Sequence, residues 1–277
     1  MKKIVVYVCV FILLFLLTNI VWSKDYGRIV SLSPSATESL YELGIEQSVV
    51  GITAYCPKGM IKKEAVGTLL EPNIEKIILL DPDLIILTKE GNSKSTAEKF
   101  EYLGFEVYVM EAAENFNEIC VSYFDLAKKL NKSKRGKRII DAARCLLDEI
   151  HNSLKGFDEL GVFWEIGARP LFTSGKRSFI NDYNYYTRTV NVYGDFNMRY
   201  FIVNIEDVIK QNPDVILLAS IDGVNNNDEV MRWNRYKTIK AVKNSKVFVI
   251  NVVDNCIFKP TPLKFAENVA LLSKIIR

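Results

Sequence analysis

Residues 74–87 read Ile-Glu-Lys-Ile-Ile-Leu-Leu-Asp-Pro-Asp-Leu-Ile-Ile-Leu, and residues 205–218 read Ile-Glu-Asp-Val-Ile-Lys-Gln-Asn-Pro-Asp-Val-Ile-Leu-Leu. The two stretches are identical at seven of fourteen positions, at an offset of 131 residues. Each predicts a short helix, a Pro-Asp turn and a buried strand. This unit is common in α/β proteins, but the shared glutamate, Glu75 in one copy and Glu206 in the other, favours a true repeat. The sequence therefore predicts two similar lobes.

Strand-like and helical stretches alternate on both sides of this repeat. The helical stretches are 34–43, which Gly44 ends, and 93–103, which Gly104 ends. The predicted strands are the short apolar runs 28–33, 49–52, 84–88, 106–110, 161–166, 215–219 and 246–251. Alternation of this kind indicates α/β lobes with mainly parallel sheets.

A long helix is predicted over residues 132–155, between the two copies of the repeat. Apolar residues recur on one face at helical spacing, the other face is charged, and Gly156 ends the run. Such a helix would be ~36 Å long at 1.5 Å per residue, enough to act as a rigid strut. The predicted organisation is an N-terminal α/β lobe (24–131), an interlobe helix (132–156) and a C-terminal α/β lobe (157–277), with both lobes Rossmann-like.

Residues 1–23 have the pattern of a secretory signal peptide. Lys2 and Lys3 precede an apolar run from Ile4 to Val21, and Val21 and Ser23 are small enough to allow cleavage after Ser23. An uncleaved membrane anchor is the alternative, because the run approaches the length that spans a bilayer. We expect an exported, periplasmic protein.

Charge and composition exclude several classes of function. The net charge is +3, and without residues 1–23 the chain has 34 basic and 33 acidic groups, so no nucleic-acid partner is expected. No phosphate-binding loop or hydrolase motif is present. The only histidine, His151, falls in the strut helix, so neither a histidine-rich metal site nor an enzyme is expected.

The cysteines also lack a redox or zinc pattern, since none belongs to a C-x-x-C pair. Cys120 and Cys145 read as core positions on helices, whereas Cys56 and Cys256 fall in loops. An exported protein could oxidise them, and their disulfide state stays open, with the unpaired state favoured.

Several segments, in this order, resemble the periplasmic binding proteins of cobalamin and iron–siderophore importers. They are Arg28-Ile-Val-Ser-Leu-Ser-Pro-Ser-Ala-Thr-Glu38, Val50-Gly-Ile-Thr-Ala-Tyr55, 91–104, Phe172-Thr-Ser-Gly-Lys176 with Phe179-Ile180, 205–218, 247–251 and Lys259-Pro-Thr-Pro262 before a last helix. The resemblance covers residues 28–277. It implies two α/β lobes joined by one long helix, with the ligand between them. Cobalamin-binding members line this cleft with tryptophans, where this chain has Leu69, Thr88 and Tyr200.

The resemblance implies a non-enzymatic component of an ABC importer that delivers a corrinoid or an iron–siderophore chelate to a permease dimer. A heme-binding transport protein is the runner-up, and a membrane-anchored interaction or sensor domain and an α/β enzyme are the rival classes. We expect a monomer without cofactor or resident metal. The expected ligand-binding residues, at strand-ending loops of both lobes, are Ser35, Ala36, Tyr55, Thr88, Arg199, Tyr200 and Lys259. Glu75 and Glu206 match the positions that face permease arginines in the family resembled.

Overall fold

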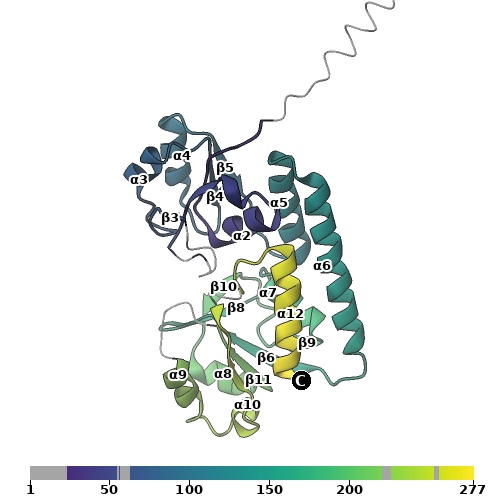
Figure 1. Ribbon diagram of the computed structural model, residues 1–277. Coiled ribbons are helices and arrows are strands. Elements are labelled where there is room, and N and C mark those ends of the chain that lie inside the picture. Colours follow the sequence, from purple (N-terminus) through teal and green to yellow (C-terminus); the bar gives the residue numbers. More distant parts are fainter. Residues whose placement is uncertain (1–23, 55, 57–62, 220–225, 253–255) are drawn as a thin grey trace, which may run out of the picture.

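Two separate parallel sheets form the two lobes of the protein (Figure 1). The computed structural model describes residues 24–277 except 55, 57–62, 220–225 and 253–255. The N-terminal sheet has the strand order β3-β2-β1-β4-β5. Its strands are β1 (Ile29–Ser31), β2 (Val49–Ile52), β3 (Glu64–Ala65), β4 (Leu84–Thr88) and β5 (Val107–Met110).

Helices cover both faces of this N-terminal sheet because its strands are apolar on both sides. Ile29 and Leu84 point into the core on one face, whereas their neighbours Val30 and Ile85 point into the core on the other. The helices of this lobe are α2 (Pro34–Glu42), α3 (Ile74–Leu79), α4 (Lys94–Tyr102) and α5 (Phe116–Lys129), with a short 3-10 turn at Glu46–Ser48.

The C-terminal lobe contains a four-stranded parallel sheet and a smaller antiparallel one. The parallel sheet has the order β12-β11-β6-β9, and β10, β8 and β7 pair in the antiparallel sheet. The strands are β6 (Leu160–Glu165), β7 (Gly167–Ala168), β8 (Leu171–Ser174), β9 (Thr189–Asn191), β10 (Tyr200–Ile202), β11 (Val215–Leu218) and β12 (Val247–Val249). The helices are α7 (Ile180–Tyr186), α8 (Ile205–Gln211), α9 (Asn226–Trp233), α10 (Lys240–Lys243) and α12 (Pro262–Ile276).

The sequence repeat corresponds to equivalent places in the two lobes. α3 leads to β4 and α8 leads to β11, and each of these strands lies next to the first strand of its own lobe. An asparagine caps each helix, because the Asn73 side chain accepts from Lys76 N and the Asn204 side chain accepts from Asp207 N. The residue before each proline, Asp81 in one lobe, has a left-handed backbone in both copies.

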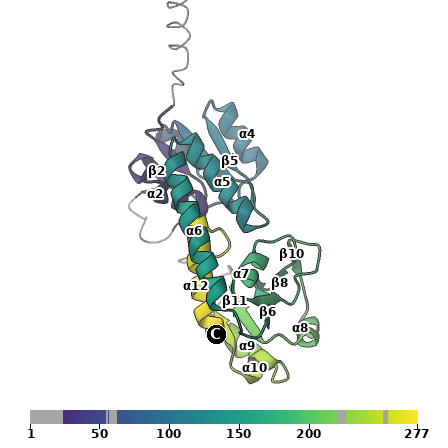
Figure 2. The same ribbon diagram turned by 90° about the vertical axis from the view of Figure 1, so that its right-hand side faces the viewer.

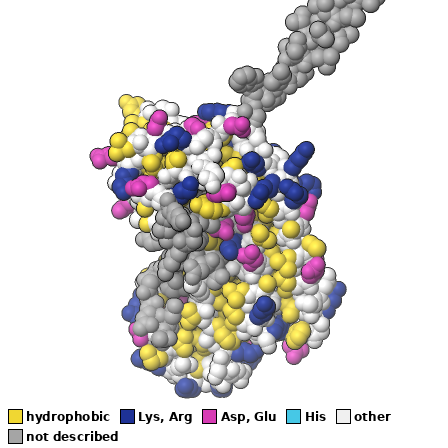
Figure 3. Space-filling view, viewed as in Figure 1, with side chains coloured by type: hydrophobic (Ala, Val, Ile, Leu, Met, Phe, Trp, Pro, Cys, Tyr) yellow, Lys and Arg dark blue, Asp and Glu magenta, His cyan; other side chains and the backbone are white. Residues whose placement is uncertain are grey.

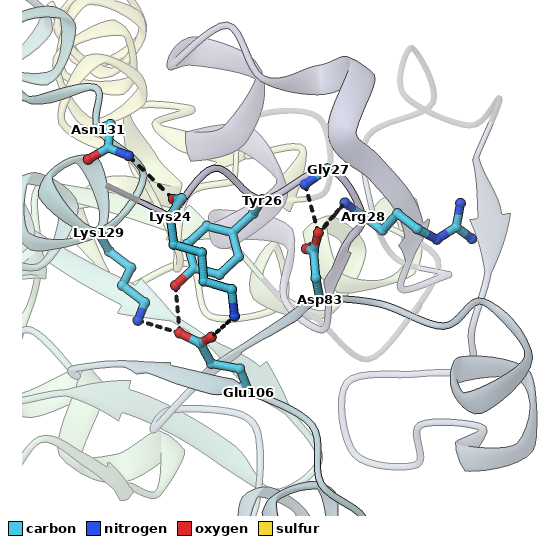
Figure 4. Close-up of polar contacts among 8 residues, drawn as sticks. All are labelled: Lys24, Tyr26, Gly27, Arg28, Asp83, Glu106, Lys129 and Asn131. Carbon is cyan, nitrogen blue, oxygen red and sulfur yellow. Dashed lines mark hydrogen bonds and ion pairs between the residues drawn. The ribbon is translucent and has the colours of Figure 1, made fainter. Parts of the chain in front are cut away.

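The aspartate of each Pro-Asp turn fastens the start of the neighbouring strand. Asp83 accepts from the backbone N–H of Gly27 at 2.8 Å and of Arg28 at 3.2 Å, just before β1 (Figure 4). Asp214 accepts from the N–H of Gly161 in β6 at 2.9 Å. A strand-edge N–H without a partner would cost stability, so this contact gives a physical reason for the identity of the aspartate in both copies.

The predicted strut is α6 (Ser133–Ser153), which is ~31 Å long at 1.5 Å per residue. It is helical from Ser133, so its charged start is not a loop. α6 does not join the lobes alone, because α12 runs beside it in both views (Figures 1 and 2). One continuous core contains Leu40 and Phe116 of the N-terminal lobe, Trp164 of the C-terminal lobe and Phe265 of α12. The lobes therefore share a core as well as a connecting helix.

One detail of the sequence interpretation is corrected. Cys145 is exposed on α6, where its Sγ lies 3.5 Å from Glu149 Oε1, because its position falls on the charged face of the helix. Cys120 is buried in α5 as expected.

No helix within the described parts of residues 24–277 combines the length and the apolar character needed to cross a bilayer.

The two repeat aspartates generate a stability prediction. We expect Asp214→Ala to lower the free energy of unfolding by about 1–2 kcal/mol, because a partly buried N–H of β6 loses its acceptor. Asp83→Ala should cost less, because the corresponding contact is exposed. Urea unfolding measures both, with Asp125→Ala, which removes only a surface ion pair, as the control. Equal stability of Asp214→Ala and the control would remove the proposed role of the aspartate.

Candidate functional site

A pocket lies where the two lobes and the start of α12 meet. The N-terminal lobe contributes the ends of β4 and β5, α2 and α5, and the C-terminal lobe contributes Phe179 and the segment before α12. Its lining residues are Ser35, Ser39, Thr88, Glu90, Met110, Glu111, Ala113, Ile119, Ser122, Tyr123, Phe179, Lys259, Pro260 and Thr261. Carboxyl ends of parallel strands are the usual ligand-binding edge of an α/β sheet. The cavity volume is about 50 Å³, small beside the roughly 300–1,000 Å³ of typical ligand pockets.

The N-terminal lobe lines the pocket with hydroxyl groups. Thr88 is the last residue of β4, and its buried Oγ1 has no hydrogen-bond partner among the described residues. Ser39 donates to the Ser35 carbonyl at 2.8 Å, and the Ser35 hydroxyl lies 3.0 Å from that of Ser33. A buried hydroxyl without a partner is costly, so Thr88 is available to a polar ligand group.

The C-terminal lobe contributes a cation, Lys259. Burial lowers the pKa of the Lys259 ammonium to about 8. Within the part of the chain that the structure describes, no carboxylate forms an ion pair with it. Its backbone N–H donates to the Cys256 carbonyl at 2.9 Å, and the helix α12 begins three residues later. A lysine in this setting gains stability when an anionic group comes close.

Arg199 joins the two lobes beside the pocket. Its guanidinium donates to the Glu90 carboxylate and, at 2.6 Å, to the Ala113 carbonyl, both in the N-terminal lobe. A second bridge runs from Arg177 to Glu114 at 2.6 Å. Arg199 Nε is buried without a partner among the described residues, so this guanidinium still has a free donor.

A buried carboxylate, Glu42, lies where α2 meets the start of α12. Thr261, the N-cap of α12, donates its hydroxyl to Glu42 Oε1 at 2.5 Å. The other oxygen, Oε2, is buried without a partner among the described residues. Burial raises the pKa of Glu42 to about 7, and burial also raises the pKa of its neighbour Glu38. The charged form of Glu42 is thus poorly stabilised at the junction between the lobes.

The structure brings together only some of the residues expected at the ligand site. Ser35, Thr88 and Lys259 line the pocket. Ala36 does not, because its side chain is fully buried in the shared core. Tyr55 lies outside the described residues.

The predicted placement of Arg199 and Tyr200 at the carboxyl end of a parallel strand is wrong. They lie at the amino end of β10, in the antiparallel sheet, where Tyr200 pairs with Ser174. The chain between β6 and α8 forms this extra sheet, which the repeat does not reveal. Arg199 nevertheless reaches the pocket edge through Glu90 and Ala113, and its guanidinium lies 5.7 Å from the centre of the Tyr200 ring.

Sequence interpretation missed several residues of the site. Glu111 directly follows β5 and Glu90 is the second residue after β4, so strand-end position was a usable signal for both. Thr261 stands between two prolines before a helical run, the pattern of an N-cap, but nothing local connects it with Glu42. Tyr123 lines the pocket from the buried face of α5.

Glu75 and Glu206 lie at equivalent places, each in the first turn of its helix and each exposed. Among the described residues neither carboxylate forms an ion pair. An acid in the first turn is favoured by the helix dipole, which explains each glutamate locally. Their exposure also leaves both available to a partner.

Comparisons with known proteins all point to one kind of protein over most of the chain. A model of the family described as periplasmic binding protein matches residues 29–252. An uncharacterised ABC transporter substrate-binding lipoprotein of Bacillus subtilis is 30% identical over 237 residues, covering 82% of this chain and 74% of the relative. The vitamin B12-binding protein of Vibrio cholerae is 27% identical over 253 residues, covering 90% and 89%. A possible iron-binding periplasmic solute-binding protein from Staphylococcus epidermidis superposes with a TM-score of 0.78 at 27% identity, covering 91% and 99%.

The raised pKa of Glu42 predicts a pH-dependent cost to folding. The folded state holds the Glu42 proton up to about pH 7, but the unfolded state loses it near the ordinary value of 4.5. The contribution of this group to stability therefore falls as pH rises from about 4.5 to about 7. We expect Glu42→Gln to raise the free energy of unfolding by about 3 kcal/mol above pH 7 and to have little effect near pH 4.5.

Urea unfolding at several pH values measures this difference. Glu101→Gln, on the exposed end of α4, is the matched control and should change stability at no pH. A constant difference between Glu42→Gln and the wild type across this pH range would contradict the prediction.

Proposed function

The chain belongs to the periplasmic binding protein family, the substrate-binding proteins of ABC importers, and we propose that its ligand is a corrinoid or an iron–siderophore chelate held between the lobes. The observation that carries this proposal is the pocket itself, which both lobes line and which contains Lys259 without an acidic partner among the described residues. The similarity to a vitamin B12-binding protein supports a corrinoid, and the similarity to a possible iron-binding protein supports a ferric chelate.

A bulky chelate requires the pocket to widen. A cavity of about 50 Å³ is far smaller than such a ligand, so the contacts that close the pocket must release when it binds. Those contacts are the bridge from Arg199 to Glu90 and Ala113 and the bridge from Arg177 to Glu114. Ligand binding then exchanges protein–protein contacts of Arg199 for contacts with the ligand, which makes this arginine a natural partner for an acidic group on the chelate.

Two cations at the pocket favour a ligand with acidic groups, whereas the lining carboxylates Glu90 and Glu111 have Arg199 and Lys89 as partners. Lys259 lacks a carboxylate partner among the described residues, and Arg199 has a buried donor that is unused there. Both would be stabilised by a carboxylate or phosphate, and Arg199 can bind such a group through two donors. Ser35 and Thr88 add hydroxyl groups on the opposite wall.

An enzymatic role receives no support from the only histidine. His151 stacks on Tyr185 with ring centres 4.7 Å apart, and its Nδ1 lies 3.1 Å from the Tyr185 carbonyl. Both residues are outside the lining of the pocket. A histidine in this place packs two helices together, so transport remains the function that the site supports best.

We further propose that the protein acts outside the cytoplasmic membrane as a monomer and docks on a permease through Glu75 and Glu206. Export with cleavage after Ser23 and the organisation 24–131, 132–156 and 157–277 belong to the same proposal. Two carboxylates at equivalent points of two similar lobes would match a twofold-symmetric partner that carries basic groups. Exposed pairs of this kind mainly guide encounter and orientation.

The identity of the ligand is tested by visible absorption of the protein purified from its host, followed by calorimetry with cyanocobalamin, a ferric siderophore and hemin. We expect a corrinoid or ferric-chelate spectrum and tight binding of one of these two. Binding of hemin alone would favour a heme-binding transport protein, and binding of none would remove the metal-chelate proposal.

Lys259→Met serves as the variant for the pocket. It should lower the affinity for an acidic chelate by about tenfold, which is the contribution of one charge-assisted hydrogen bond. Wild-type affinity should also fall as pH rises through about 8, because Lys259 loses its charge there, and this decline should be absent from the variant. Lys264→Met, on α12 and paired with Glu267, is the matched control.

The docking proposal is tested with the double variant Glu75→Arg and Glu206→Arg. Ligand affinity should be unchanged because both residues lie outside the pocket, whereas uptake of the ligand by cells should be abolished. Charge reversal of two other exposed acids, Glu101→Arg with Glu159→Arg, is the control and should leave uptake intact. Normal uptake by the first variant, at a normal level of exported protein, would exclude these carboxylates from docking.

A further inference from the structure

Basic residues are concentrated where α5 ends and α6 begins. Seven of the eleven residues from 128 to 138 are lysine or arginine and none is acidic, although the whole chain has a net charge of only +3. We call residues 128–138 the basic corner. Lys and Arg side chains gather over this corner in the space-filling view (Figure 3). The proposed ligand pocket and docking residues make no use of it.

Helix stability does not explain these charges. Lys128 and Lys129 lie in the last turn of α5, where the helix dipole favours cations. At the start of α6 the dipole favours acids, yet its first turn contains none. Lys132 occupies the N-cap without a side-chain hydrogen bond, and Lys134 and Arg135 follow it. Arg135 contributes to folding by donating to the carbonyl of Glu42, the last residue of α2. Lys132 and Lys134 form no such contact among the described residues, and a local rule broken without a folding benefit indicates a functional constraint.

Part of the basic corner has acidic partners, but only at the surface. Lys128 pairs with Asp125 at 2.7 Å and Lys137 with Asp141 at 2.6 Å, and all four side chains are about half exposed or more. Such pairs contribute little to stability and leave their outer donors in solvent. Four further side chains form no ion pair among the described residues: Lys132, Lys134, Arg135 and Arg138. Arg135 donates to the Glu42 carbonyl at 2.6 Å, which leaves Lys132, Lys134 and Arg138 without a side-chain polar contact there.

The residue that follows the predicted export segment is fastened to the same corner (Figure 4). Lys24 pairs with Glu106 at 2.5 Å, and its carbonyl accepts from Asn131 at 3.3 Å. Lys129 also binds Glu106, at 2.6 Å, and these contacts, that of Lys129 first, lower the pKa of Glu106 to about 2. Lys24 therefore lies directly beside the basic corner.

Apolar side chains border this face of the N-terminal lobe. Leu103 and Lys24 line the same open groove, together with Asp81, Asp83 and Glu106. Glu106 is neutralised by Lys24 and Lys129, and Asp83 accepts from backbone N–H groups. Leu103 follows Tyr102, which is 90% exposed at the end of α4, and Leu79 at the end of α3 is 84% exposed. Exposed tyrosine and leucine beside clustered lysine and arginine are typical of surfaces that rest on a bilayer.

We propose that the basic corner and this adjoining edge bind the surface of a bilayer that contains anionic phospholipids. The unpaired cations would meet lipid phosphates, which would also relieve the repulsion at the start of α6. Tyr102 and Leu103 would rest at the interface.

This contact would hold the protein apart from its proposed docking geometry. Glu75 begins α3 at the carboxyl edge of the sheet, whereas Leu79 and Asp81 follow at the opposite edge, with Lys24 and the groove. A protein that rests on its basic corner thus turns the amino edge of its N-terminal sheet toward the bilayer and the carboxyl edge, with Glu75, away from it. The lipid contact is consequently a waiting position, which the protein leaves in order to dock.

The test compares binding to vesicles of phosphatidylglycerol mixed with phosphatidylcholine and to vesicles of phosphatidylcholine alone. The protein is the exported form isolated from cells, and the measured quantity is the ratio of the two affinities, which removes any contribution of a retained apolar segment. The triple variant Lys132→Glu, Lys134→Glu and Arg138→Glu should reduce this ratio by about 100-fold, since each cation near an anionic surface contributes about 1 kcal/mol. Added salt should reduce the wild-type ratio in the same way.

A second triple variant, Arg235→Glu, Lys237→Glu and Lys243→Glu, reverses the same number of exposed charges on the C-terminal lobe and should keep the wild-type ratio. Equal losses in both variants, or a wild-type ratio near one, would overturn the proposal. Stronger binding to a DNA duplex than to anionic vesicles would also overturn it. The replacements Lys132→Gln, Lys134→Gln and Arg138→Gln repeat the test without charge reversal. Ligand affinity reports folding in every variant, because the basic corner lies outside the pocket.

Discussion

The stack of aromatic rings around Phe265 is the contact on which the rest of the molecule depends. Its ring lies 4.2 Å from that of Tyr183 in the C-terminal lobe and 4.8 Å from that of Phe116 in the N-terminal lobe. Through these contacts α12 becomes part of both lobes. Because the segment just before α12 carries Lys259 and Thr261, the same packing places the cation of the pocket and the hydroxyl group that meets Glu42.

The two lobes share a scaffold but not a chemistry. The repeated parts are structural: helix caps, left-handed turns and aspartates that fasten neighbouring strands. The pocket is built from parts that have no counterpart in the repeat. Thr88 and Glu90 come from one lobe, Arg199 from the extra antiparallel sheet of the other, and Lys259 from the approach to α12. The repeat therefore accounts for the frame around the pocket, whereas the polar groups of the pocket lie outside the repeated residues.

Much of this fold can be predicted from the sequence, wherever a long apolar run or an apolar stripe at helical spacing exists. The strands 49–52 and 84–88 have their predicted bounds, and α6 begins within one residue of its predicted start. The strands of the antiparallel sheet have only two to four residues, too few for a periodic signal, so the position of Arg199 just before one of them was not predicted. The raised pKa of Glu42 was also beyond prediction, because it arises from burial by a helix more than 200 residues away.

The shared core has a consequence for the order in which the protein can be made. Residues up to Ile276 of α12 complete a hydrophobic core that begins at Tyr26, so the N-terminal lobe lacks part of its packing until the last residues of the chain have been synthesised. A chain with its C-terminus still in the ribosome cannot close this core. The native state of both lobes therefore becomes available only once the whole chain, including α12, is free of the ribosome.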